Sequence, residues 1–291
     1  MEHPRKKPRK PAARKPAHAK PSAAELDSEI AAMNQDATAP GLIEGVYNYC
    51  DRWCERCPLT ARCLLFRTST RREAEASAKA ETARDNEAFW NEIALSFAAA
   101  IRMVRRDAKK RGIDLDSPEL QAEVEREEKS RRRAAARSGN EIHRAASAYW
   151  KAGQKLLAAL VPTLVETNRA LATEAELGIG QPGQTAASLG DALEIVEWYL
   201  FFVDVKLRRA VSSRVDERRD HAEGPKDSDG SAKIALIAID RSIAAWSLLR
   251  RQFEAEHGDT ILDLLVQLER LRRAVEAKFP HARAFRRPGW D

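Results

Sequence analysis

Apolar residues recur at every third or fourth position through most of the chain, which is the spacing that lines one face of an α-helix. The clearest stripe lies in residues 71–111, a stretch without glycine or proline. It consists of Phe89, Trp90, Ile93, Phe97, Ile101 and Val104. We therefore predict one long helix there, preceded by a weaker helix at 23–38 and a short one at 42–47.

Start and stop signals divide the region that follows. Ser117 and Pro118 form a typical helix start, with the hydroxyl as the cap and proline in the first turn. Residues 119–137 are nearly all charged and predict an exposed helix, because Glu and Arg are mixed along them. Residues 138–140 then predict a new start, with Asn140 as its cap.

The next helix carries Gly153, which allows another helix to approach closely, and Pro162, which predicts a kink. The glycine-rich residues 178–184 should end it. Two later segments, 193–211 and 234–253, are apolar nearly all round. This pattern is typical of central helices, which are buried on every side.

Residues 227–230 read as a polar turn, and Asp259 as the cap of a last helix that stops at Pro280. The composition favours helices, because it is 43% hydrophobic, 32% charged and only 6% aromatic. We predict an all-α fold, an irregular bundle of about five long helices. Its segments are a disordered basic arm at 1–22, a cysteine-cluster segment at 23–70, the helical bundle at 71–280 and a C-terminal tail at 281–291.

The net charge of +6 belongs to the arm. Residues 1–21 carry eight Lys or Arg and one Glu, a net of +7, which leaves −1 for the other 270 residues. The same stretch has five of the thirteen prolines, so it should be extended and disordered. Two interpretations stay open: a weak contact with nucleic acid or another polyanion, or a solubilising tail without a partner.

The sequence has no feature that predicts export or membrane insertion. No apolar run reaches the roughly 18 residues of a membrane span, and the basic N-terminus lacks the apolar stretch of a secretory signal. We therefore expect a cytoplasmic protein without membrane contact. In that reducing compartment, clustered cysteines indicate metal ligands or redox groups rather than disulfides.

All four cysteines lie within fourteen residues, in a C-x3-C-x2-C-x5-C pattern formed by Cys50, Cys54, Cys57 and Cys63. A 4Fe–4S cluster and a structural zinc both need four thiolates that converge on one point. Zinc ribbons usually separate two C-x2-C knuckles by about a dozen residues or more, so the compact span favours the larger, roughly cubic cluster. We predict a 4Fe–4S cluster on these cysteines, with zinc as the alternative.

Parts of the pattern resemble known cluster loops. Residues 54–63, C-x2-C-x5-C, resemble the cluster loop of endonuclease III-like DNA glycosylases, whose first gap is longer. That resemblance implies only the ligand role of the cysteines, since the catalytic Lys and Asp pattern is not evident. Residues 50–57 match the C-x3-C-x2-C spacing of radical SAM enzymes, but Cys63 is placed to fill the iron position that those enzymes leave open. Pro58 after Cys57 is similar to the Cys-Pro pairs of bacterial ferredoxins.

Acidic residues inside the two apolar runs form a second candidate site. Glu194, Glu197 and Asp204 lie close to one face of the first run, and Asp240 lies in the second. Burying a carboxylate without a partner costs several kcal/mol, so partners are expected. The interpretations are ion pairs with nearby cations, a polar ligand pocket, or a di-metal site like that of di-iron bundles. The nearby cations are Lys206, Arg208, Arg209 and Arg241.

Three functions follow from these features. The favoured one is a four-cysteine metal-binding helical protein whose 4Fe–4S cluster is structural or exchanges electrons with a redox partner. The second is a zinc-stabilised helical binding or scaffold protein whose basic arm contacts nucleic acid. The third is a helical enzyme with the buried carboxylate site. The sequence identifies no reaction and no substrate.

Overall fold

The computed structural model describes residues 21–79, 86–219 and 224–291. Over these residues the chain forms the helices α1–α7 and three short 3₁₀ turns, with no strand. The predicted all-α fold is therefore confirmed. Five helices have 25 residues or more, and two shorter ones raise the total above the expected number. Residues 1–20 of the predicted arm lie outside the described residues.

The chain divides into two compact units and enters the second one twice. The first unit contains the chain up to Pro40 together with Leu65–Ser117, and the second contains Gly41–Leu64 together with Pro118–Asp291. The predicted segment 23–70 is thus shared between the units. All four cysteines fall in the second.

Ion pairs join the helices of the first unit. These helices are α1 (Ala23–Ala37), α2 (Leu64–Lys79, all but its first residue) and α3 (Asn86–Lys110). Asp36 of α1 is only 3% exposed, and it binds Arg67 at 3.2 Å and Arg71 at 2.8 Å, both on α2. Asp27 of α1 binds Arg102 of α3 at 3.1 Å. The buried carboxylate therefore has the partners that its burial requires.

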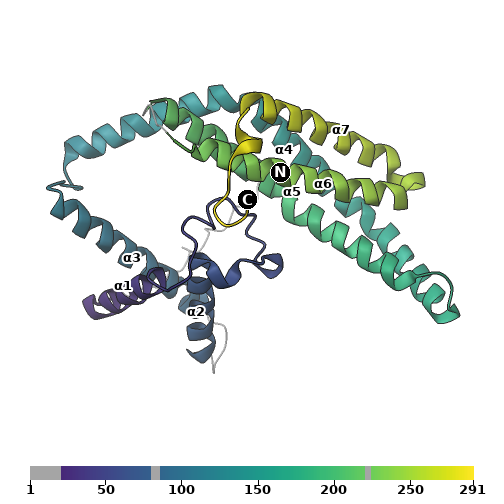
Figure 1. Cartoon of the computed structure of the whole chain (residues 1–291), viewed down its shortest axis with the longest axis horizontal. Coiled ribbons are helices and arrows are strands. Elements are labelled where there is room, and N and C mark those ends of the chain that lie inside the picture. Colours follow the sequence, from purple (N-terminus) through teal and green to yellow (C-terminus); the bar gives the residue numbers. More distant parts are fainter. Residues whose placement is uncertain (1–20, 80–85, 220–223) are drawn as a thin grey trace, which may run out of the picture. The chain divides into compact units, whose positions relative to one another are not determined.

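Four long helices lie alongside one another in the second unit (Figure 1). They are α4 (Pro118–Leu177), α5 (Pro182–Arg219), α6 (Asp227–Gln252) and α7 (Glu254–Lys278). α5 packs against α4 and α6, and α7 packs against the same two helices. Tyr149, Tyr199, Leu207, Trp246 and Leu268 are fully buried between them. Inside this core the indole N–H of Trp246 donates a hydrogen bond to the Tyr149 hydroxyl over 3.1 Å.

α4 and α5 approach each other closely at Gly153, as the sequence predicts. A Cβ atom at this position would overlap the side chain of Leu200 on α5. Because helix interiors are packed to the density of organic crystals, any side chain here would push the two helices apart.

α4 begins at Pro118, as predicted, but the predicted new start at 138–140 is wrong. The helix continues through these residues and through Pro162 without interruption. A single glycine inside a helix costs only about 1 kcal/mol, and the Glu, Arg and Ala residues before it are good helix formers. Arg131, on this exposed part of α4, also pairs with Asp216 of α5 at 3.5 Å.

Other helix ends also differ from the predicted ones. α5 begins at Pro182, ahead of its apolar run, and α7 begins at Glu254 rather than at Asp259. The short helix expected at 42–47 is replaced by turns. The helix expected at 71–111 corresponds to α2 and α3, with residues 80–85 outside the described part. An apolar run marks the buried middle of a helix and not its polar ends, so these ends carry little signal.

The polar turn expected at 227–230 is in fact the first turn of α6. Its start is capped from outside the helix, because the Glu217 carboxylate of α5 accepts a hydrogen bond from the Ser228 backbone N–H over 2.8 Å. The Ser228 hydroxyl donates to the same carboxylate over 2.6 Å. A cap supplied by a distant residue leaves no local sequence pattern.

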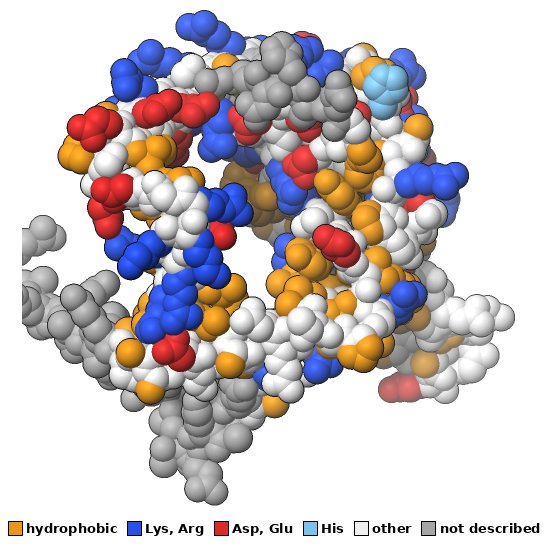
Figure 2. Space-filling view, turned by 60° about the vertical axis from the view of Figure 1, so that its left-hand side comes forward, with side chains coloured by type: hydrophobic (Ala, Val, Ile, Leu, Met, Phe, Trp, Pro, Cys, Tyr) orange, Lys and Arg blue, Asp and Glu red, His pale blue; other side chains and the backbone are white. Residues whose placement is uncertain are grey.

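Charges of both signs share the surface of the protein. Figure 2 shows Lys and Arg side chains interspersed with Asp and Glu over the visible face. This mixture agrees with the near-zero net charge of the residues after the arm. Among the described residues, no helix combines the length and the apolar character that crossing a lipid bilayer would need.

Candidate metal centre

Two short turns present two of the four cysteines in the same way. These 3₁₀ turns are η1 (Cys54–Arg56) and η2 (Thr60–Arg62), and a cysteine follows each one. The amides of Cys57 and Cys63 donate to the carbonyl three residues back, over 3.2 and 3.1 Å. Both cysteines have an extended backbone, with φ −89° and ψ 122° at Cys57 and φ −109° and ψ 115° at Cys63.

All four thiols are free and half-buried. Burial raises the pKa of Cys54, and the charges of Cys50, Cys57 and Cys63 raise this pKa further. The other three thiols therefore lie within electrostatic reach of Cys54. The backbone N–H of Leu59 donates to Cys57 Sγ over 3.4 Å.

Two cations lie near Cys50. Burial raises the pKa of Cys50, and a backbone hydrogen bond from Arg52 opposes this rise, as do the charges of Arg52 and Lys206. Lys206 on α5 is only 8% exposed, and burial followed by the charge of Arg209 lowers its pKa. Its Nζ lies 5.2 Å from the centroid of the Phe202 ring. Positive charge held beside the thiols suits the net negative charge of a four-thiolate centre.

Asp51 attaches the cysteine loop to α5 and α6. Its Oδ2 accepts hydrogen bonds from the Tyr199 hydroxyl over 2.6 Å and from Arg241 Nη1 over 2.9 Å. Its Oδ1 accepts from the backbone N–H of Trp53 over 3.2 Å, and its carbonyl accepts from the indole N–H of Trp198 over 3.0 Å. The residue directly after Cys50 is therefore fixed by two helices.

Trp53 supplies the apolar part of the same contact. Its ring stacks on Trp198 with centroids 5.0 Å apart and an angle of 16° between the planes. Tyr199 packs edge to face on the same ring with centroids 6.0 Å apart, and the guanidinium carbon of Arg56 lies 4.0 Å from the ring centroid. Arg56 also binds Asp191 and Glu194 of α5, each at 2.5 Å. The spacer residues of the cysteine pattern thus hold the loop against α5.

The C-terminal tail packs on the other side of the loop. Phe285 meets Tyr49 edge to face, with ring centroids 4.7 Å apart, and the Tyr49 hydroxyl donates to Asp227 over 3.1 Å. Gly289 lies against Ile43, since a Cβ there would come within 2.7 Å of it. The tail, in which the sequence shows no helical pattern, is thus part of the support of the loop.

The donor set fits a four-thiolate centre in residue type, because all four cysteines lie on one loop as free thiols. Within the residues that the structure describes, however, no three His, Cys, Asp or Glu side chains are gathered closely enough to hold a metal ion. The thiols are neighbours on one loop and are not drawn into ligating geometry. Metal binding at this site therefore requires the loop to tighten around the ion or cluster.

The acidic residues of the second candidate site are not brought together. Asp204 is 3% exposed and its Oδ2 accepts from Arg208 Nε over 2.8 Å, which is one of the expected ion pairs. Its Oδ1 is buried without a hydrogen-bond partner in the described part of the chain. Asp240 binds Arg283 at 2.5 Å and Arg272 at 3.5 Å.

The burial expected for Glu194 and Glu197 is not found, because their positions on α5 face outward. An apolar run does not reveal the rotation of its helix, so the outward side was not apparent from the sequence. Two expected cations have other acids as partners: Arg209 binds Asp227 at 2.6 Å, and Arg241 binds Asp51. The structure therefore assembles no carboxylate centre from the four acids.

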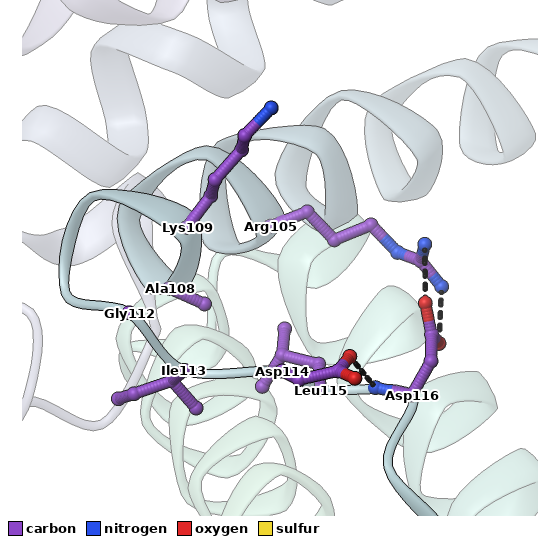
Figure 3. Close-up of a pocket in the computed structure, with 8 residues that line it drawn as sticks. All are labelled: Arg105, Ala108, Lys109, Gly112, Ile113, Asp114, Leu115 and Asp116. Atoms are coloured by element: carbon purple, nitrogen blue, oxygen red, sulfur yellow. Dashed lines mark hydrogen bonds and ion pairs between the residues drawn. The ribbon is translucent and has the colours of Figure 1, made fainter.

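A pocket of about 410 Å³ in the first unit follows the end of α3 (Figure 3). Gly112, with φ 71°, ends the helix, and the Ile113 amide donates back to the Ala108 carbonyl over 2.9 Å. The charged groups at its rim, Arg105 and Asp116, bind each other through two hydrogen bonds of 2.9 and 3.1 Å. The hollow is a consequence of the helix end, and two of its charged groups, Arg105 and Asp116, neutralise each other.

Comparison of the chain with models of protein families, with curated proteins and with solved structures finds no match in any of the three.

Proposed function

We propose that Cys50, Cys54, Cys57 and Cys63 bind a metal centre, and that a 4Fe–4S cluster is its occupant. The observation that carries this proposal is the presence of four free thiols on one short loop, three of which act electrostatically on Cys54. Four thiolates are the ligand set of both a 4Fe–4S cluster and a structural zinc. Zinc is therefore the alternative occupant.

The attachment of the loop supports a structural or electron-transfer role. A bound 4Fe–4S cluster supplies one-electron redox chemistry, and exchange with a redox partner would take place in the reducing cytoplasm. The residues of the chain hold the loop: Asp51 and Trp53 contact α5 and α6, and Phe285 contacts it from the tail. Arg52 and Lys206 offset the negative charge of the thiolates.

Metal content tests the proposal directly. Protein purified without oxygen should contain about four irons and four inorganic sulfides per chain and should absorb broadly near 400 nm. One zinc per chain and no visible absorption would identify the alternative occupant. Protein prepared under these conditions with neither metal, and unable to take up either one afterwards, would overturn the proposal.

Thiol counting gives a second readout, because every cysteine of the chain belongs to the loop. The folded, metal-loaded protein should resist alkylation at all four positions, and a chelator should expose all four. Changing any one of them to serine should lower the metal content. Glu55→Gln, an exposed change within the same loop, is the matched control and should leave it unchanged.

We also propose that the basic arm makes a weak contact with nucleic acid. The support is its charge of +7 over residues 1–21. Neutralising phosphates releases counterions, so such binding must weaken steeply with salt. Deleting residues 1–21 should abolish salt-dependent binding to duplex DNA in a gel-shift titration. Binding that persists at the same strength would assign the contact to other residues.

A further inference from the structure

A pocket of about 500 Å³ in the second unit lies where the last turns of α5, the start of α6 and the segment after α7 meet. Its volume is that of a typical small-molecule site. The residues that line it are polar or charged with one exception: Arg214, Glu217, Arg218, Lys226, Ser228, Asp229, Pro280 and His281.

Three permanently charged cations line the pocket and outnumber its two acids. Arg214 and Arg218 lie one turn apart on α5, and like charges at this spacing repel each other. Over the described residues, neither has an ion pair, and neither does Lys226. The Arg214 guanidinium is held over the buried ring of Phe279, with its carbon 5.2 Å from the ring centroid. Burial lowers the pKa of Arg214, and the charge of Arg218 lowers it further.

The two acids that line the pocket, Glu217 and Asp229, offset part of this positive charge, since both act electrostatically on Arg214. Glu217 is engaged by Ser228, whose backbone N–H and hydroxyl both donate to its carboxylate. Asp229 is half-buried and forms no ion pair within the described residues, and burial raises its pKa. Three permanent cations against two carboxylates leave a charge of +1.

We propose that this pocket binds the phosphoryl group of a small phosphorylated molecule. A guanidinium group offers a planar fork of N–H donors that matches phosphate oxygens two at a time, and two such groups stand one turn apart here. An anion would relieve the repulsion between Arg214 and Arg218.

Calorimetric titration of the full-length protein with inorganic pyrophosphate, and separately with inorganic phosphate, tests the proposal. Arg218→Gln and Lys226→Gln should each weaken pyrophosphate binding about tenfold or more, because each removes a charge-assisted contact. Arg273→Gln is the matched control. It removes the same charge from an exposed pair with Glu269 on α7, outside the pocket, and should leave the affinity unchanged.

A substitution that should strengthen pyrophosphate binding gives a second test. Asp229→Asn removes a negative charge from the pocket and should tighten pyrophosphate binding severalfold. Weaker binding by this variant would mean that the pocket favours a cationic group and would overturn the proposal. An equal loss in the control Arg273→Gln would show binding by net charge alone, and no measurable binding at millimolar pyrophosphate would also overturn it. None of these outcomes depends on metal at the cysteine loop.

Discussion

At the scale of single residues, Asp51 is the residue on which the position of the cysteine loop depends. It is 14% exposed at its side chain and accepts hydrogen bonds from α5, from α6 and from its own loop. Nothing in the sequence marks it, because a lone Asp between two cysteines has no periodicity and its partners lie far along the chain. The cysteines themselves were apparent from the sequence, whereas their attachment was not.

Asp51→Asn should lower the free energy of unfolding by about 1–3 kcal/mol, because charge-assisted bonds to Arg241 and Tyr199 are weakened in a mostly buried site. Urea unfolding followed by tryptophan fluorescence would measure it, since Trp53 and Trp198 stack at this contact. Asp116→Asn breaks an exposed pair instead and should cost less than about 1 kcal/mol. Equal effects of the two changes would contradict the role given to Asp51.

Tyr149 makes the stability fall at alkaline pH. Burial raises the pKa of its hydroxyl from 10 to about 12, while the unfolded chain keeps the ordinary value. Between pH 10 and 12 the folded protein holds a proton that the unfolded chain has released, so the free energy of unfolding falls as pH rises. The loss from this group should reach about 3 kcal/mol.

Unfolding by urea at several values from pH 9 to pH 12 would measure this loss. Tyr149→Phe should flatten the pH dependence, because it removes the late-titrating group, although it also removes the bond to Trp246 at every pH. An unchanged slope in this variant would assign the alkaline loss to other groups.

At the scale of elements, the apolar stripes identified most of the helices, but α5 is not buried on every side as expected, because Phe201 and Val205 on it are exposed. The ends of the helices were missed for a physical reason. The first turns of α5 and α6, at 182–192 and 227–233, are polar or small and carry no stripe, and the Ser228 amide is capped by Glu217 from a neighbouring helix. Tertiary contacts of this kind decide where a helix starts and leave no local pattern.

Replacing two helical glycines by alanine should change the stability of the protein in opposite directions. At Gly230 in α6 a Cβ would overlap the rings of Tyr49 and Phe285, so Gly230→Ala should destabilise the protein by about 1–3 kcal/mol. At Gly190 in α5 a Cβ meets nothing within 4 Å, so Gly190→Ala should stabilise it by about 0.5–1 kcal/mol. Thermal unfolding of both variants would check the pair. The same sign for both would mean that the tail and the loop do not pack on α6 as described.

At the scale of the whole molecule, the sequence revealed the four candidate cysteine ligands but not the residues that hold their loop in place. The residues that hold the loop are distant from it in sequence. Trp198 and Tyr199 lie inside an apolar run, and Phe285 lies in a tail without helical periodicity. For the acids of that run, the sequence showed the positions but not the burial. Their spacing was visible, but whether Glu194 faces the core or the solvent depends on the rotation of α5 within the unit, which a pattern apolar on all sides cannot show.

Because loop and tail pack on one another, metal at the cysteines should stabilise a defined part of the second unit. A ligand that binds only the folded state adds its binding free energy to stability, and here the contacts run from the loop to the tail. Removing the metal should therefore increase amide hydrogen exchange in Gly41–Leu64 and in residues 281–291. Residues 119–134, in the mostly exposed first part of α4, are the internal control within the same unit.

Mass spectrometry of exchanged peptides, before and after chelation, separates this mechanism from its alternatives. Faster exchange in the loop alone would mean that metal binding does not stabilise the tail through the contact of Phe285 with Tyr49. The proposed coupling would then be wrong. Faster exchange everywhere, including 119–134, would mean that the metal supports the global stability of the fold. Only a change confined to loop and tail fits a centre that holds Tyr49 against Phe285 while the helices keep their own core.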